Sequence, residues 1–178
     1  MSIAPDFYSA HSFLGIVDQK LGRWEMAEEQ YRRARELNPK AVAPLVNLGS
    51  LFLQESELPE ESAEAAKQLI ERAIRTLQEA IQLDSGYRTT YFFLGVAEYK
   101  TGAFDTAVGH FLQASEIESE ELPVRLMLAN IDIKQGNWEG ALDFIDSWRA
   151  DHPESPNRNR VDSLRAQVLT SLEAPRQR

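Results

Sequence analysis

The sequence contains no cysteine among its 178 residues. Disulfides, thiol catalysis and cysteine-based metal sites are therefore excluded, although this absence fits the cytoplasm and the periplasm alike. No apolar run approaches the ~20 residues that a membrane-spanning helix needs. Basic residues are few, since 19 Lys and Arg stand against 28 Asp and Glu, for a net charge of −9. Nucleic acids and membrane surfaces are disfavoured as partners, because both bind proteins through Lys and Arg.

Residues that could carry chemistry are also sparse. The three histidines, His11, His110 and His152, have spacings that fit no metal-ligand motif, and we expect structural or surface roles for them. The acidic pair Glu60 and Glu61 falls where a helix is expected to start, which favours a solvated surface over acid–base catalysis. No glycine-rich phosphate loop is present. The sequence predicts no catalytic residue, no metal site and no cofactor, and hence a protein that is not an enzyme.

A repeat of 34 residues organises what the sequence does contain. Gly15 and Gly49 are 34 residues apart, and so are Gly95 and Ala129, each directly after a leucine. The interval from Gly49 to Gly95 is 46 residues, which is one repeat plus an insertion of 12. A small residue at this position lets two antiparallel helices approach closely. Fixed spacing of this kind indicates a repeat architecture.

Further columns of the repeat describe one unit. A second small residue is followed four positions later by a bulky one, in the pairs Ala27–Tyr31, Ala73–Leu77, Ala107–Phe111 and Ala141–Ile145. Gly22, Gly102 and Gly136 follow the first helix, where a left-handed residue ends it. Pro39 and Pro153 stop the second helix, and Ser85 and Ser119 stand in that column of the other two units. Each unit is therefore a helix, a tight turn and a second helix, and neighbouring units must stack to bury their apolar faces.

This series resembles the tetratricopeptide repeat, with its pattern Trp-x2-Leu-Gly-x2-Tyr, then Ala-x3-Phe, then Pro. The resemblance covers about residues 8–153. It implies an all-α fold, a right-handed superhelical solenoid of antiparallel helix pairs. We expect one domain over 1–178, with units at about 8–41, 42–87, 88–121 and 122–155. The opening Trp of the pattern is replaced by His11, Leu45, Tyr91 and Arg125.

The two ends carry separate expectations. The apolar spacing over residues 157–173 predicts a capping helix. Its inner face would carry Val161, Leu164, Val168, Leu169 and Leu172, and its outer face Arg158, Arg160, Asp162 and Arg165. We expect Trp148 to pack against this helix, which shields the last pair. Ile3 and Pro5 lie 34 residues before Leu37 and Pro39. This spacing suggests the hypothesis that the chain is an excised piece of a longer array.

The insertion, around residues 55–66, lies between the two helices of the second unit. Pro59 suits a first helical turn, and continuous apolar spacing follows it. We therefore expect one long second helix over about 59–83, two or three turns longer than its counterparts. Its projecting start is either a contact for a partner or a dimer, or a solvated extension.

The resemblance further implies that the first helices line a concave groove. The predicted partner-binding residues are Ser12, Ile16, Lys20, Val46, Asn47, Ser50, Phe92, Val96, Tyr99, Lys100, Leu126, Asn130 and Lys134. This mixture of polar and apolar side chains suits an extended or helical peptide with a few apolar anchors. Some of these residues could instead pack between adjacent first helices. The three lysines recur in one column, where they either form a basic row for acidic peptides or interact with helix dipoles.

These observations predict a non-catalytic scaffold that binds a peptide or a partner protein in its groove, as part of a larger protein. Two alternatives stay open. One is a self-association module that forms a homo-oligomer through the long helix or an uncapped N-terminal face. The other is a non-catalytic regulatory domain of an enzyme.

Overall fold

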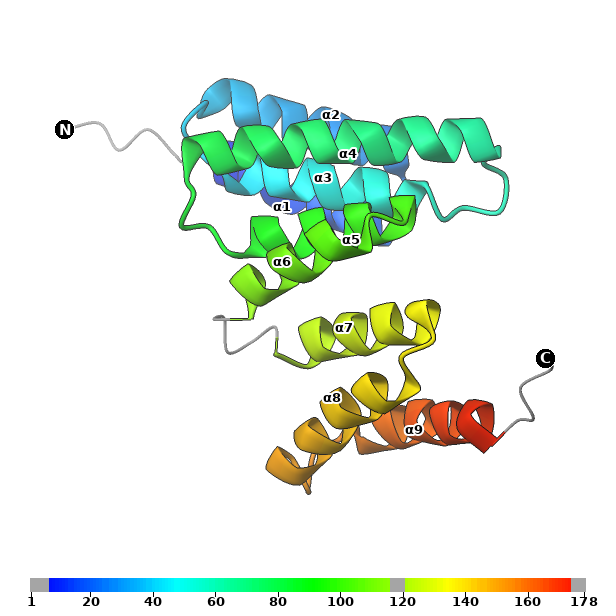
Figure 1. Cartoon of the computed structure of the whole chain (residues 1–178). Helices are drawn as coiled ribbons and strands as arrows, with labels where there is room; N and C mark the ends of the chain where they lie inside the picture. The colour runs from blue at the N-terminus through cyan, green and yellow to red at the C-terminus, as the bar shows by residue number, and fades with distance from the viewer. Residues whose placement is uncertain (1–6, 116–120, 174–178) are drawn as a thin grey trace. The chain divides into compact units, whose positions relative to one another are not determined.

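The described part of the chain is helical throughout in a computed structural model, which describes residues 7–115 and 121–173. Those residues form helices and turns, without a strand. The helices are α1 (Phe7–Lys20), α2 (Trp24–Leu37), α3 (Ala43–Glu55), α4 (Ala63–Leu83), α5 (Thr89–Thr101), α6 (Phe104–Ala114), α7 (Glu121–Gln135), α8 (Trp138–Asp151) and α9 (Arg158–Glu173) (Figure 1). The expectations for Ile3, Pro5 and Ser119 lie outside the described residues.

Neighbouring helices pack as the predicted pairs. Helix α1 packs against α2, α3 against α4, and α7 against α8. The chain divides into two compact units, residues 1–110 and residues 111–178, and each is described by itself. The predicted all-α arrangement of helix pairs is therefore confirmed.

Two glycines show why the small-residue column is needed. A Cβ on Gly15 would lie 2.5 Å from Cε1 of Tyr31, and a Cβ on Gly49 would lie 2.6 Å from Cδ2 of Leu77. Both distances are below van der Waals contact, so only glycine lets the two helices of each pair approach this closely. The turn between the helices depends on a second glycine. Gly102, for example, has a φ of 80° and ends α5 in the left-handed conformation.

The second unit of the repeat differs from the prediction at the start of its long helix. Helix α4 has 21 residues, whereas α2 and α8 have 14 each, so the extension is real. The helix begins at Ala63, because the Ser62 hydroxyl accepts a hydrogen bond from the Ala65 amide at 3.1 Å and caps it. The expected start near Pro59 is therefore wrong. Pro59, Glu60 and Glu61 lie in the turn that precedes the helix.

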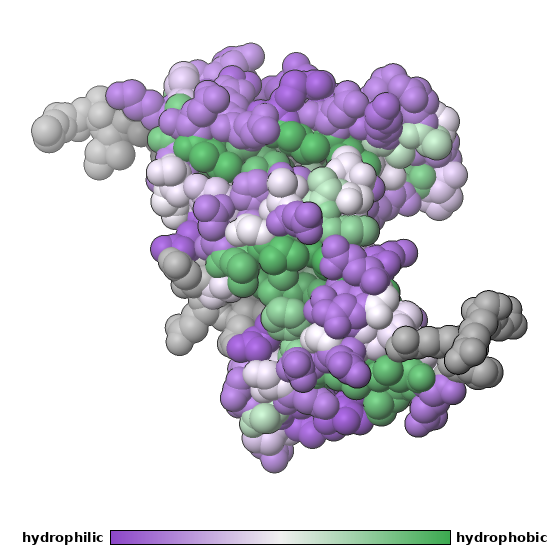
Figure 2. Space-filling model, viewed as in Figure 1, coloured by the Kyte–Doolittle hydropathy of each residue, from purple (hydrophilic) through white to green (hydrophobic). Residues whose placement is uncertain are grey.

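The core of the first compact unit lies around α3. One apolar cluster joins Tyr31 of α2, Leu51 of α3 and Ala73 of α4, and a smaller one joins Val46 to Ala80. Figure 2 shows that the side of α4 facing away from α3 is mostly hydrophilic. An apolar strip runs along the side of α4 nearer to α3. Helix α4 is thus amphipathic, and its apolar side belongs to the core.

The core of the second compact unit joins the capping helix to the last pair. Trp148 and Ile145 of α8 share one apolar cluster with Val161 and Val168 of α9. The prediction that Trp148 packs against the capping helix is confirmed. The Trp148 ring also stacks on His152, with ring centroids 4.8 Å apart. Among the described helices, none is both long and apolar enough to cross a membrane.

Candidate protein-binding surface

In the first compact unit, α3 packs against both α1 and α5, which are the first helices of the flanking pairs. Ile16 of α1 and Val96 of α5 both pack on the cluster that contains Leu53 of α3. Seven of the thirteen predicted groove residues are half-buried here and keep part of their surface accessible: Ser12, Ile16, Asn47, Phe92, Val96, Tyr99 and Lys100. The Phe92 ring lies edge-on to Phe93 at 5.4 Å. Three helices that pack on one another therefore each carry half-buried residues of the predicted groove.

Two predicted groove residues of α3 are buried instead. Val46 lies in the apolar cluster with Val42, Leu45 and Ala80. The Ser50 hydroxyl donates a hydrogen bond to the Asn47 carbonyl oxygen at 3.0 Å, inside its own helix. Because α3 has helices on several sides, its apolar residues face the core almost all round. We therefore leave Val46 and Ser50 out of the proposed binding surface.

The hydroxyl of Ser12 is in a third kind of environment. Its oxygen is inaccessible and has no hydrogen-bond partner among the described residues. A hydroxyl in this state offers nothing to a partner without movement of its neighbours. We therefore assign Ser12 no contact role.

The three lysines of the predicted basic row differ from one another. Lys20 and Lys134 are exposed in the last turns of α1 and α7, where the helix dipole stabilises a cation. Lys100 donates to Glu57 at 2.5 Å. Since Glu57 belongs to the turn between α3 and α4, the insertion reaches the end of α5 and neutralises this lysine. Lys100 is thus part of an internal ion pair.

The second compact unit contains a cavity of about 300 Å³. Helix α7 contributes Leu126, which is buried in the core cluster of this unit, and the half-buried Asn130, and both are predicted groove residues. The remaining lining residues come from α9, namely Arg160, Ser163, Leu164 and Gln167. Sequence reasoning missed this second wall, although the spacing of these four residues places them on one side of a helix. Helix α9 therefore both caps the core and lines the candidate surface.

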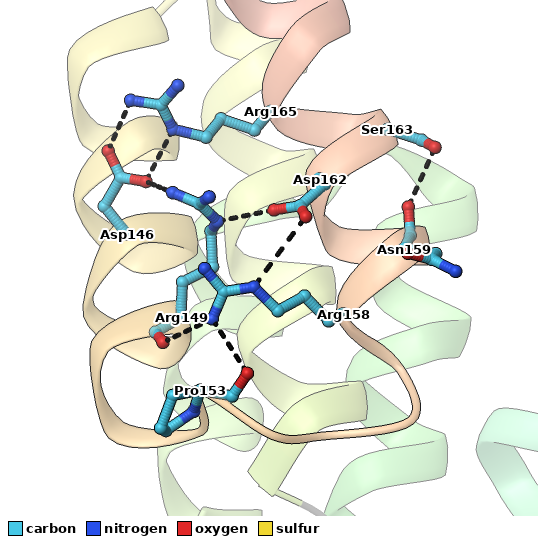
Figure 3. A network of polar contacts seen from close by, with 8 residues as sticks. All are labelled: Asp146, Arg149, Pro153, Arg158, Asn159, Asp162, Ser163 and Arg165. Atoms are coloured by element: carbon cyan, nitrogen blue, oxygen red, sulfur yellow. Dashed lines mark hydrogen bonds and ion pairs between the residues drawn. The ribbon is translucent and has the colours of Figure 1, made fainter.

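A network of ion pairs fixes α9 against α8 (Figure 3). Arg149 of α8 donates to Asp162 of α9 at 2.6 Å, and Arg165 of α9 donates to Asp146 of α8 at 2.7 Å. The hydrogen bond from Arg165, with a further one from Arg149, holds the pKa of Asp146 below its usual range. Arg158 lies 3.8 Å from Asp162.

This network corrects one expectation about the capping helix. Arg158, Asp162 and Arg165 were expected on its solvent side, whereas they contact residues of α8 or the chain that follows it. Arg160 lies apart from them and lines the cavity. The charges of α9 therefore divide between a side that holds the helix in place and a side that faces the cavity.

A larger hollow of about 570 Å³ lies over α1 and α2 in the first compact unit. Its lining is charged, and part of that charge is paired: Glu28 accepts from Arg32 at 2.6 Å and from Arg72 at 2.5 Å. Arg72 also lies 4.0 Å above the Phe52 ring. Burial raises the pKa of Glu55 at the nearby end of α3. The contact between Glu28 and Arg72 therefore holds α2 to α4.

The three histidines make internal contacts. Nδ1 of His11 lies 2.7 Å from Oε1 of Gln30, and Nδ1 of His110 lies 2.6 Å from Oε2 of Glu98. His152 stacks on Trp148, as described above. Within residues 7–115 and 121–173, no three side chains of the metal-binding types gather in one place. Each histidine therefore has a contact within its own compact unit.

Three profiles of the tetratricopeptide repeat match the sequence, over residues 8–41, 62–121 and 100–168. Together they cover most of the chain. The chain belongs to the tetratricopeptide repeat (TPR) family. Comparison with curated proteins gives no significant match.

Solved structures, among them TPR proteins, share the fold. A thermophilic TPR protein of Thermus thermophilus is 20% identical, with a TM-score of 0.79, over 92% of this chain and 81% of that one. A chain of the APC/C hetero-tetramer Cut9–Hcn1 is 19% identical, with a TM-score of 0.73, over 91% of this chain and 30% of that one. The second TPR of Spaghetti, bound to an HSP90 peptide, is 22% identical, with a TM-score of 0.52, over 62% of this chain and 92% of that one. At these identities the likeness establishes the TPR solenoid fold.

Proposed function

We propose that this TPR chain is a non-catalytic interaction module that binds a peptide segment of a partner protein. The observation that carries the proposal is the cavity between α7 and α9. It combines the apolar side chains Leu126 and Leu164 with the amides of Asn130 and Gln167. A lining that combines apolar side chains with a few polar groups is what binding one anchoring side chain of a peptide requires.

The charge of this cavity restricts the kind of peptide that it would bind. Arg160 is the one charged residue among the six that line it. The chain carries a net charge of −9, so a local cation matters for an acidic segment that the rest of the surface repels. We therefore expect bound peptides to place an acidic residue near an apolar one. The half-buried Phe92, Val96 and Tyr99 of α5 offer further apolar contact surface in the first compact unit.

Selection from a phage-displayed library of random peptides tests the proposal without knowledge of the natural partner. Enriched peptides are synthesised, and their Kd is measured by calorimetry. The double variant Arg160→Ala/Gln167→Ala should bind at least about tenfold more weakly, a loss of ~1.4 kcal/mol. Thr170→Ala is the matched control, because Thr170 is exposed on the same helix and does not line the cavity.

Two results would count against this function. The library could yield no enriched peptide, or the double variant could bind as tightly as Thr170→Ala. The contribution of α5 is tested separately, by capture of partners from the source cell with the unchanged chain and with Phe92→Ala/Tyr99→Ala. Equal capture would remove α5 from the binding surface.

A further inference from the structure

The outer side of α1 carries an exposed apolar stripe that continues into the turn after it. It consists of Phe7, Ala10, Phe13, Leu14, Val17 and Leu21, which are all exposed. At 100° per residue, these six positions span about 120° of the helix circumference. Continuous apolar surface of this kind normally faces a protein core or a partner. We refer to these six residues as the α1 stripe.

The repeat shows what the α1 stripe is built for. Leu14 is 52% exposed and Val17 is 51% exposed. The residues 34 positions later, Leu48 and Leu51 of α3, are 4% and 0% exposed. They lie in the cluster that also contains Tyr31 of the preceding pair. The matching residues of α5, Leu94 and Ala97, are buried as well. The α1 stripe is therefore a stacking surface of the repeat whose neighbour is absent from the described structure.

The size of the α1 stripe suits a weak interface. With about 200 Å² for an aromatic side chain, the 57% exposure of Phe7 and the 68% exposure of Phe13 leave about 250 Å² accessible. Leu14, Val17 and Leu21 bring the total to about 500 Å². Two such stripes would bury about 1,000 Å² together, at the lower end of specific protein interfaces.

We propose that two copies of this chain form a symmetric dimer, in which the α1 stripe of each copy covers the α1 stripe of the other. The surface is self-complementary because it is apolar along its whole length, as an isologous contact requires. The net charge of −9 does not oppose the contact locally. The only acidic residue of α1, Asp18, is buried and lies 3.4 Å from Arg23, and Lys20 is the one other charged residue of the helix.

Helix α9, the last helix of the described residues, does not offer an equivalent surface. The exposed residues of α9 are polar apart from Ala166: Asn159, Arg160, Ser163, Gln167, Thr170 and Glu173. Stacking of α1 onto α9 of another copy would set the apolar stripe against these polar groups, at a desolvation cost. Pairing of α1 with α1 avoids that cost. The contact therefore closes as a dimer and does not continue as a filament.

This inference does not depend on the proposed peptide binding. Ile16 faces away from the centre of the α1 stripe by about 130°, at 100° per residue. The cavity of the second compact unit contains no residue of α1. Failure of peptide binding and failure of dimerisation are thus separate results.

Sedimentation velocity of the full chain, from about 1 µM to about 300 µM, tests the dimer. The unchanged chain should convert from monomer to dimer as its concentration rises. Val17→Glu should raise the dissociation constant at least about tenfold, because it sets two carboxylates in the contact. Leu83→Glu is the control, since Leu83 is 45% exposed at the end of α4 and lies outside the α1 stripe. A chain that is monomeric throughout, or a Val17→Glu variant that dimerises normally, would overturn the proposal.

Cross-linking gives a second readout that does not introduce a charge. The chain has no cysteine, so Leu14→Cys creates a single thiol at the middle of the α1 stripe. Two copies paired through this stripe place these thiols together, and mild oxidation should give a covalent dimer. The Leu83→Cys control should remain largely monomeric under the same oxidation. Equal cross-linking of both variants would contradict pairing through α1.

Discussion

Arg165 of α9 holds both oxygens of one carboxylate on α8. Its Nε donates to Asp146 Oδ1 at 2.7 Å, and its Nη2 donates to Asp146 Oδ2 at 3.2 Å. This two-point geometry fixes the direction of the guanidinium plane as well as the distance between the charges. Asp146 therefore sets the position of α9, the helix that supplies most of the cavity wall (Figure 3).

Arg165→Lys should loosen the capping helix while keeping the charge. An ammonium group cannot make two parallel hydrogen bonds to one carboxylate. Both partners are partly exposed, so we expect only a small loss in unfolding free energy. Hydrogen exchange should accelerate across α9 and stay unchanged in α1 to α4. Arg160→Lys is the control, because Arg160 lies on the same helix but outside the ion-pair network. Slower or unchanged exchange in Arg165→Lys would show that the pair does not hold α9.

The same pair predicts a dependence of stability on pH. Hydrogen bonding by Arg165, more than any other cause, lowers the pKa of Asp146 in the folded chain. A carboxylate with a lowered folded-state pKa stabilises the fold above its unfolded value of ~3.9. That contribution is lost as the pH falls through the folded-state value. Urea unfolding should therefore show Asp146→Asn to be less stable than the unchanged chain at pH 7, with a difference that shrinks below about pH 4.

The Arg165→Met variant is a second background, in which the effect of Asp146→Asn can be measured without the Asp146–Arg165 ion pair. In Arg165→Met, the effect of Asp146→Asn should lose most of its dependence on pH, because the main cause of the lowered pKa is gone. A difference that persists unchanged at low pH, or that is the same in both backgrounds, would rule out this pair as its origin.

The repeat columns predicted the fold because they record local requirements. Gly15 needs to be small because Tyr31 lies against it, and Gly102 needs a left-handed backbone. Such requirements act within one helix pair, so spacing alone reveals them. The start of α4 was misplaced for a similar local reason. Pro59 and the acidic residues after it are typical of a first helical turn, but the Ser62 cap lies three residues further on.

The candidate site was harder to predict because it depends on what lies on each side of a helix. Residues of α3 are apolar around most of the helix, so periodicity could not show that Val46 would be buried. Helix α9 has charged residues on more than one side, so the sequence could not show which would pair with α8. The structure shows that Asp146 and Arg149 of α8 lie on the side of α9 that carries Arg165 and Asp162, whereas Arg160 lines the cavity.

Gly15→Ala should destabilise the chain although alanine favours helices. The added Cβ would lie 2.5 Å from the Tyr31 ring. This ring is fully buried, and its hydroxyl donates to Gln19 at 2.7 Å, so it cannot move aside freely. Overpacking of this kind costs about 1–3 kcal/mol, which outweighs a helix-propensity gain of up to ~1 kcal/mol.

Gly109→Ala is the matched control for this prediction. Gly109 lies within α6, and a Cβ there would meet no atom within 4 Å. It should raise the midpoint of thermal unfolding slightly through helix propensity. If Gly15→Ala were as stable as Gly109→Ala in thermal unfolding, close packing of the first helix pair would not be the reason for the glycine column.

Trp148→Ala should release the capping helix from the last pair. The indole is buried in the cluster that contains Val161 and Val168 of α9, and truncation of a buried tryptophan costs about 3–5 kcal/mol. We expect a lower midpoint of thermal unfolding and faster hydrogen exchange over Arg158–Glu173. Trp24→Ala removes the same side chain from the half-buried start of α2 in the first compact unit, and it should leave the exchange of α9 unchanged. Unchanged thermal stability of Trp148→Ala would refute the packing role of Trp148, and equal exchange of α9 in the two variants would show that Trp148 does not anchor the helix.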